Sequence, residues 1–224
     1  MQQPFWKRML SYVTELHIES APSDINPHLY VSLRNGRYQL CTDNAIYSYE
    51  DKYTNFVQAF EQLPLAKMGI KNVLILGFGL GSIPFILEQS GFDYHYTGVE
   101  IDDSVLYLAH KYMLDKINSP LELIEANALP FVWQCQEKYD MICMDVFQDA
   151  MVPSEFESIE FLEQLKSLLS PKGTLLYNRL TALPEHESNT FNFYIQGFKK
   201  VFSEARAIKL QGNWILAGQA DSPD

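Results

Sequence analysis

Two features of the sequence are suited to hold a nucleotide. Gly77, Gly79 and Gly81 are spaced two residues apart, directly after the apolar run 72–76 and at the start of a predicted helix. Glycines let the backbone turn sharply and approach a ligand closely, and the first turn of a helix presents unpaired N–H groups. Glu100 ends the next predicted strand, where a carboxylate can accept hydrogen bonds from both hydroxyls of a ribose. The pattern predicts an adenosine-containing ligand, with a tight turn that binds nothing as the alternative.

The elements that would position these residues begin at residue 70, where strands alternate with helices. The last two predicted strands, 205–210 and 214–217, are only three residues apart, which is too short for a parallel crossover. A mostly parallel seven-stranded sheet whose last strand is antiparallel is the Rossmann-like layout of class I methyltransferases. Predicted strands lie at 72–76, 94–100, 121–124, 139–145, 174–177, 205–210 and 214–217, and predicted helices at 81–89, 103–114, 156–169 and 190–202.

This layout also decides between two cofactors. A nicotinamide site carries glycines in the spacing G-x-G-x-x-G, whereas this chain has G-x-G-x-G. Together with the terminal hairpin, the glycine spacing predicts S-adenosylmethionine, and a nicotinamide cofactor is the alternative.

The chain before residue 65 has a different pattern. Asn35-Gly36 separates the strand-like runs 29–33 and 37–41, which is a strong hairpin signal because both turn residues accept positive φ. A third strand is predicted at 45–49 and a helix at 51–62. We therefore predict an N-terminal β-hairpin region with a linking helix over residues 1–64, and an S-adenosylmethionine-binding domain over residues 65–224.

Three further residues are predicted to contact the nucleotide. The turn after the third strand of the predicted sheet borders the adenine in this fold, and it contains Asn127 and Ala128. The amide of Asn127 can donate to and accept from an adenine, or it can cap the next helix. Ile101, beside Glu100, can pack on the adenine or the ribose edge, or in the core.

The chain resembles the spermidine synthase family of aminopropyltransferases over residues 29–178. The resemblance lies in the segment Asn35-Gly36-Arg37-Tyr38-Gln39 with the following Tyr47-Ser48-Tyr49-Glu50, in the glycine loop, and in Val99-Glu100-Ile101-Asp102. It implies that Asp145 is the catalytic residue beside the methionine end of the cofactor. It also implies that Gln39, Tyr49 and Asp149 line the acceptor side. From the residues alone, Asp145 can instead be a loop cap and Tyr49 an ordinary strand aromatic.

Two departures from the family pattern bear on the group that is transferred. The family usually has Asp where this chain has Leu80, and a second acid followed by Pro where it has Gln148. Fewer carboxylates weaken an ammonium site, so we predict a methyltransferase that uses intact S-adenosylmethionine. Its acceptor would be a small molecule, with amines among the candidates. Aminopropyl transfer from decarboxylated S-adenosylmethionine is the second hypothesis, and a non-catalytic nucleotide-binding module is the third.

The composition excludes several other classes. The 224 residues carry a net charge of −11, which disfavours nucleic acid as a partner. The histidines and cysteines form no spaced set of metal ligands, so no metal is expected. The absence of a signal peptide and of an apolar run of about 18 to 20 residues predicts a cytoplasmic protein without a membrane span. The N-terminal strands and the aromatic residues on predicted helices suggest a homodimer.

Overall fold

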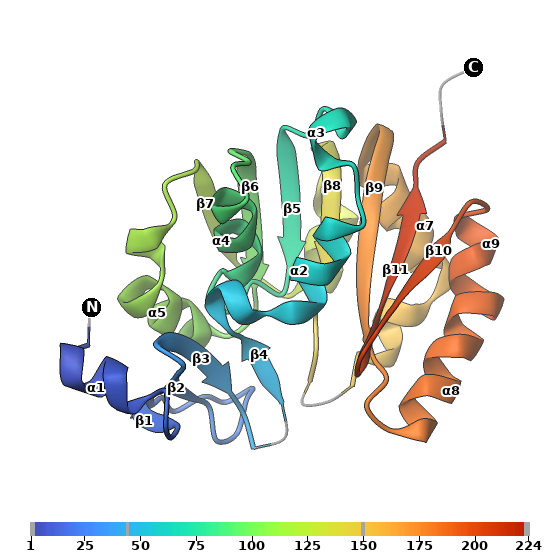
Figure 1. Cartoon of the computed structure of the whole chain (residues 1–224). Coiled ribbons are helices and arrows are strands. Elements are labelled where there is room, and N and C mark those ends of the chain that lie inside the picture. Colours follow the sequence, from blue (N-terminus) through green and yellow to red (C-terminus); the bar gives the residue numbers. More distant parts are fainter. Residues whose placement is uncertain (1–2, 44, 149–150, 222–224) are drawn as a thin grey trace.

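The structure, a computed structural model, describes residues 3–43, 45–148 and 151–221. Figure 1 shows a large sheet in the middle of the molecule, with helices on both faces, and a small sheet below it. The large sheet has the strand order β10-β11-β9-β8-β5-β6-β7. Its strands are β5 (Asn72–Leu76), β6 (His95–Glu100), β7 (Leu121–Glu125), β8 (Tyr139–Met144), β9 (Leu169–Leu180), β10 (Arg206–Leu210) and β11 (Asn213–Gln219).

Strand direction confirms the predicted fold. β5 pairs in parallel with β6 and β8, β6 with β7, and β8 with β9, whereas β11 is antiparallel to both of its neighbours, β9 and β10. The last strand is therefore the antiparallel one, as predicted. The large sheet with its helices is a class I methyltransferase-like fold.

The central strand explains why two helical layers form. Val73 and Ile75 of β5 belong to one hydrophobic cluster, and Leu74 and Leu76 belong to the other. Alternate residues of a strand point to opposite faces, so an unbroken apolar strand needs helices on both sides. One face is covered by α2 (Thr54–Glu61), α3 (Leu65–Met68), α4 (Ser82–Gln89) and α5 (Asp103–Tyr112), and the other by α6 (Ala128–Gln134), α7 (Ile159–Leu168), α8 (Pro184–Phe193), η4 (Tyr194–Phe198) and α9 (Lys199–Val201).

The small sheet contains the predicted hairpin and one strand that was not predicted. Asn35 (φ 50°) and Gly36 (φ 73°) form the turn between β2 and β3 with the predicted positive φ values. β1 was missed because its apolar alternation consists of only two residues, Leu16 and Ile18. The order is β1 (Leu16–Ser20), β2 (Tyr30–Arg34), β3 (Arg37–Cys41) and β4 (Ile46–Ser48), preceded by α1 (Phe5–Leu10) and followed by η1 (Glu50–Lys52).

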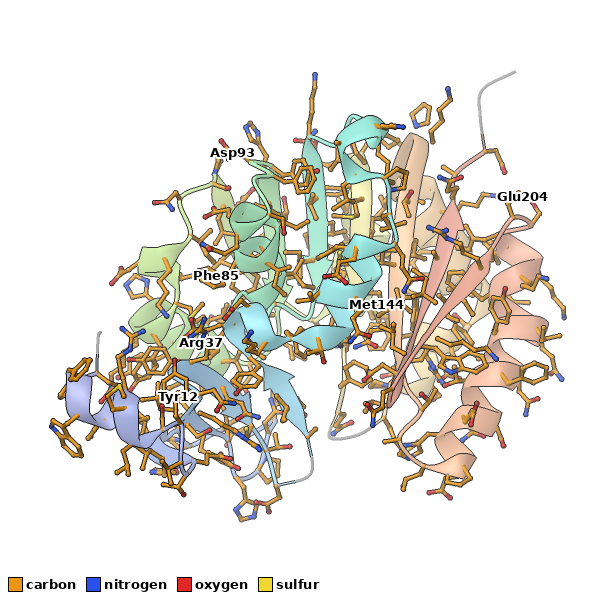
Figure 2. All side chains as sticks on the ribbon, viewed as in Figure 1. Tyr12, Arg37, Phe85, Asp93, Met144 and Glu204 are labelled. Carbon is orange, nitrogen blue, oxygen red and sulfur yellow. The ribbon has the colours of Figure 1, made fainter. Side chains whose placement is uncertain are left out.

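The two sheets share a hydrophobic cluster. Val31 and Leu40 of the small sheet belong to the cluster that also holds Ile83 of α4. Figure 2 shows side chains of both parts between Arg37 of β3 and Phe85 of α4. The division of the chain near residue 65 stays a prediction.

One helix begins earlier than predicted. The helix expected at 190–202 starts at Pro184, whose fixed φ suits the first helical turn. The sequence from Glu185 to Asn189 is polar and gave no apolar periodicity, so the start was placed too late. Over the described ranges, none of the helices combines the length and the apolar character that a membrane crossing requires.

Candidate functional site

A cavity of about 200 Å³ opens at the carboxyl ends of the parallel strands β5, β6, β7 and β8, on the side of the small sheet. This edge of an open α/β sheet is where ligands bind, because the strand order reverses there. The predicted residues that line it are Gly77, Gly79, Glu100, Ile101, Asn127, Ala128 and Asp145. Four strands that are distant in sequence therefore bring the predicted nucleotide residues together.

The three glycines of the loop have different tasks. Gly77 has φ of 83°, and a Cβ there would clash with the carbonyl oxygen of Asp145, so glycine lets the ends of β5 and β8 meet. Gly79 (φ 57°) lines the cavity. Gly81 was predicted to bind the cofactor, but it lies outside the cavity lining and packs against Phe78 and Ile117. Its glycine is required by packing at the start of α4.

Glu100 faces the glycine loop. One carboxylate oxygen, Oε2, accepts from the N–H of Gly79 at 3.1 Å, and Oε1 accepts from the N–H groups of Ile101 at 2.9 Å and Asp102 at 3.2 Å. Burial raises the pKa of Glu100, and the three N–H donors oppose that rise. Oε1 accepts two bonds and Oε2 only one, so Oε2 keeps a lone pair with which the carboxylate can still accept from a ribose.

The residues predicted to contact the adenine lie beside Glu100. Ile101 is 43% exposed although it is apolar, and its side chain lines the cavity. Asn127 caps α6, since its Oδ1 accepts from the N–H of Leu129 at 2.9 Å. The capping alternative therefore holds for Asn127, while contact of Asn127 and Ala128 with an adenine stays a prediction.

Asp145 follows β8 and lies, half-buried, between two donors. Its Oδ1 accepts from Nδ2 of Asn178 at 2.8 Å, and its Oδ2 accepts from the hydroxyl of Tyr53 at 2.9 Å. Burial raises the pKa of Asp145 to about 7, the negative charge of Glu100 adds to the rise, and the two hydrogen bonds oppose it. A carboxyl group with a pKa near neutrality can take up a proton at physiological pH. Burial also raises the pKa of Tyr53 well above its ordinary value, so Tyr53 donates as a neutral phenol.

The predicted acceptor residues lie in a second cavity of about 690 Å³. It shares Tyr47, Tyr53 and Phe147 with the first cavity and includes Gln39 and Tyr49. Gln39 is 1% exposed, and its Oε1 has no hydrogen-bond partner among the described residues. A buried acceptor without a partner is costly unless a ligand or water satisfies it.

The other two acceptor-side predictions have different outcomes. The hydroxyl of Tyr49 is held at the hairpin, where it donates to the carbonyl of Arg34 and accepts from Asn35, both at 3.2 Å. Tyr49 therefore lines the second cavity with its hydroxyl already bonded. Asp149 lies outside the described residues.

Sequence reasoning missed a loop that closes the first cavity. Ile25 and Asn26 line the cavity, and Nδ2 of Asn26 donates to Oδ2 of Asp102 at 2.6 Å. Tyr47 donates to Oδ1 of Asn26 at 3.0 Å, which ties the loop to β4 as well. No local motif marks Asn26. The available signal was Asp102, which caps α5 through Oδ1 and has its other carboxylate oxygen, Oδ2, available for Asn26.

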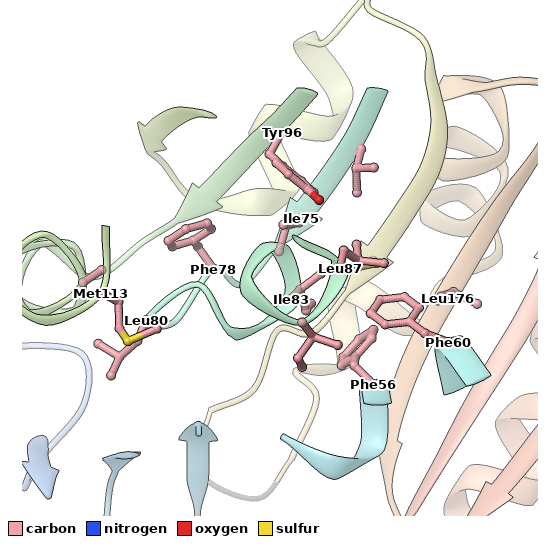
Figure 3. Packing of buried hydrophobic residues seen from close by; sticks show 14 of the residues in the cluster. Phe56, Phe60, Ile75, Phe78, Leu80, Ile83, Leu87, Tyr96, Met113 and Leu176 are labelled. Carbon is pink, nitrogen blue, oxygen red and sulfur yellow. The ribbon is translucent and has the colours of Figure 1, made fainter. Parts of the chain in front are cut away.

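Two side chains change how the departures from the family pattern are interpreted. Leu80, where the family usually has Asp, is fully buried in the hydrophobic core, near Met113 (Figure 3). Gln148 does line the first cavity, together with Glu155, an acid that the sequence analysis did not single out. The cavity therefore contains three acids among its described residues: Glu100, Asp145 and Glu155.

The fold and this cavity define a class I methyltransferase-like domain with a nucleotide-type site. Residues 51–210 match the family described as the Spermine/spermidine synthase domain, so the chain belongs to the spermine/spermidine synthase family, as the resemblance predicted.

Individual relatives fall into two groups. A polyamine aminopropyltransferase of Vibrio vulnificus (strain CMCP6) is 29% identical over 160 residues, which cover 68% of this chain and 51% of that protein. An N-terminal histidine N-methyltransferase of Emericella nidulans (strain FGSC A4) is 34% identical over 130 residues, which cover 54% of this chain and 22% of that protein. The chain thus spans about half of the length of the first relative and about a fifth of the second.

The solved structures agree on the fold. The crystal structure of spermidine synthase from Thermotoga maritima superposes with a TM-score of 0.71 and 18% sequence identity, over 93% of this chain and 74% of that chain. The likeness therefore extends to the N-terminal strands as well as the large sheet.

Proposed function

We propose that the protein is a transferase that moves an alkyl group from an S-adenosyl sulfonium donor to an amine. The observation that carries this proposal is the position of Asp145, which shares one cavity with Gly77 and Glu100 while Tyr53 and Asn178 hold it as a hydrogen-bonded carboxylate. When bound, the donor supplies a carbon already activated by the neighbouring sulfonium. The task left to the protein is mainly positioning and removal of a proton.

The donor site would be formed by the loop, the acid and the adenine-side residues. Glu100 would accept from the ribose hydroxyls, and Ile101 would pack against the base. Gly77 and Gly79 line the cavity, and a side chain at either position would press on the neighbouring Asp145 or on Tyr47 and Ser48. These residues therefore offer an acceptor for the ribose and an apolar surface for the base, as an adenosine requires.

The charges of the cavity favour the decarboxylated donor and therefore aminopropyl transfer. The described residues that line it include three acids and no Lys, Arg or His. A carboxylate on the donor would find no cationic side chain there, whereas an ammonium group would be attracted to Asp145 or Glu155. The Vibrio vulnificus relative, named a polyamine aminopropyltransferase, supports the same assignment.

Methyl transfer from intact S-adenosylmethionine is the second candidate. Gln148 is neutral at the position where the family carries a second acid, which weakens the grip on an ammonium group. The Emericella nidulans relative, which is 34% identical, is named a methyltransferase. The two candidates share the donor site and differ in the group transferred.

On the acceptor side, Asp145 would take a proton from the amine, and Tyr53 would keep the carboxylate oriented. Gln39 would bind an N–H of the acceptor through its unpartnered Oε1. The donor would thus occupy the first cavity and the acceptor the second, and the two cavities meet at Tyr53 and Phe147.

To test the proposal, the purified protein is incubated with each donor and with diamines, polyamines or peptides that have a free amino terminus. We expect methylthioadenosine from the decarboxylated donor and less adenosylhomocysteine from the intact donor. Adenosylhomocysteine alone would establish the second candidate. Binding of both donors without either product would leave a non-catalytic nucleotide module, and no calorimetric binding at millimolar donor would overturn the proposal. Asp145→Asn is the control for background turnover.

A further inference from the structure

A chain of amides connects the terminal hairpin to Asp145. Nδ2 of Asn178, on β9, donates to Oδ1 of Asp145 at 2.8 Å, and Oδ1 of Asn178 accepts from Nδ2 of Asn213 at 2.9 Å. Asn213 is the first residue of β11, directly after the turn that joins β10 to β11. The β9–β11 register pairs Ile215 with Asn178, which makes Asn213 a diagonal neighbour of Asn178.

The direction of these bonds follows from the chemistry of the three groups. An ionised carboxylate only accepts, so Asn178 must turn its N–H towards Asp145. Its carbonyl then faces the other way, where it needs a donor because Asn178 is buried. Asn213 supplies that donor.

We propose that Asn213 is a positioning residue, which fixes the amide of Asn178 so that its N–H, and not its carbonyl, faces Asp145. If Asn178 turned over, its carbonyl would face the carboxyl group and could bind it only in the protonated form. With its own amide oriented as in the structure, Asn213 opposes this rotation, because a turned Asn178 would place its N–H against the N–H of Asn213. The last hairpin therefore helps to keep Asp145 ready to accept a proton.

The titratable groups that act on Asp145 are Tyr53 before α2 and Glu100 at the end of β6. Asp145 in turn raises the pKa of the neighbouring Cys143 on β8, and Glu155 lines the same cavity. Asn178 and Asn213 carry no charge, so they influence Asp145 through hydrogen bonds. A change at Asn213 can thus be separated from a change in the surrounding charges.

The experiment measures the protonation of Asp145 directly, by carboxyl ¹³C NMR of the ligand-free protein labelled at aspartate, with Asp145→Asn to assign the signal. Asn213→Ala is expected to raise the titration midpoint of Asp145 by about one pH unit, a tenfold change in proton affinity. Asn213→Gln, which keeps an amide donor, is expected to recover part of the shift. Gln211→Ala is the matched control, since Gln211 is exposed in the same turn.

An unchanged midpoint in Asn213→Ala, or an equal rise in Gln211→Ala, would overturn the proposal. The consequence for turnover rests on the proposed function: the pH–rate profile of Asn213→Ala should move upward by the same amount. Because the NMR measurement needs no activity, failure of the amide chain and failure of the proposed function can be told apart.

Discussion

At the scale of single residues, the sequence predicts the residues at the strand ends of the site but not the hydrogen-bond partners of Asp145. Gly77, Glu100 and Asp145 end strands of a recognisable fold, so their meeting at one edge follows from the order of the elements. Tyr53 and Asn178 reach Asp145 from 92 and 33 positions away, through packing that no local pattern reveals. The hydrogen bonds that hold Asp145 were therefore outside the reach of sequence reasoning.

The pKa of Asp145 sets a pH dependence. In the proposed reaction Asp145 acts as a carboxylate, so activity should rise with pH around a midpoint of about 7. Tyr53→Phe removes a donor to the carboxylate, raises the pKa of Asp145 further and should move the midpoint of the pH–rate profile upward by about one unit. The profile of kcat/KM against pH measures this shift, because it reports the pKa values of the free enzyme. Tyr107→Phe, at an exposed position, should leave the midpoint in place, and a downward shift in Tyr53→Phe would contradict the assignment.

Replacing Asp145 should affect the catalytic rate and the folding stability in opposite directions. Asp145→Asn should lower kcat at pH 8 by about 100-fold or more, because a general base is lost. Folding raises the pKa of Asp145 from 3.8 to about 7, so the folded protein holds this proton more tightly than the unfolded chain. The charged carboxylate therefore destabilises the fold increasingly as pH rises through that interval.

We accordingly expect Asp145→Asn to be more stable than the wild type at pH 8, with the difference vanishing towards pH 4. Urea unfolding at a series of pH values measures both proteins. A variant less stable than the wild type at pH 8 would mean that the hydrogen bonds from Tyr53 and Asn178 outweigh the burial of the charge.

At the scale of elements, close approach of strand ends determines where glycine is indispensable. Gly77 and Gly91 have nearly the same φ, 83° and 84°, but only Gly77 lies against another strand end. The loop between Pro22 and His28 provides the second constraint, because it closes the cavity through Asn26. The sequence predicted the glycine loop from its spacing, whereas the closing loop depends on contacts with Asp102 and Tyr47.

The two glycines allow a matched comparison. Gly91→Ala should lower the free energy of unfolding by roughly 1–2 kcal/mol, the cost of left-handed backbone for a residue with a Cβ. Gly77→Ala should lower the free energy of unfolding by the same backbone cost and by about 1–3 kcal/mol more, because its Cβ meets the backbone of Asp145. Urea unfolding with an unchanged m-value measures both. Equal losses would show that the strand ends can move apart.

The closing loop should affect donor binding more than turnover. Asn26→Ala removes the bonds to Asp102 and Tyr47, so we expect the KM for the donor to rise about tenfold while kcat stays within about a factor of two. Asp24→Ala, at an exposed position of the same loop, is the control. An effect on kcat alone would place Asn26 in the chemistry instead.

At the scale of the whole molecule, the sequence predicted the seven-stranded sheet but not how the small sheet packs against it. The hydrophobic runs and the short final turn specified strand number and direction, while the contacts of β1 and of the closing loop arise only on folding. The ion pair between Lys116 and the buried Glu50, at 2.9 Å, adds a polar link between the two parts. The homodimer and the cytoplasmic location stay predictions.

The shared hydrophobic cluster leads to a prediction for unfolding. Because Val31 and Leu40 pack in the same cluster as Ile83, the two sheets should lose structure together in a single cooperative transition. Far-UV and near-UV circular dichroism in urea should give coincident curves. Two separated transitions would support an independently folding unit before residue 65.

The reversed direction of β11 has one further consequence. A parallel strand can bring only its carboxyl end to the edge where the nucleotide residues gather, and the antiparallel strand brings its amino end there instead. Asn213 reaches Asn178 by this route, across a turn of two residues and without a crossover helix. Changes in the length of that turn would thus alter the environment of Asp145 while leaving the strands β5 to β8 untouched.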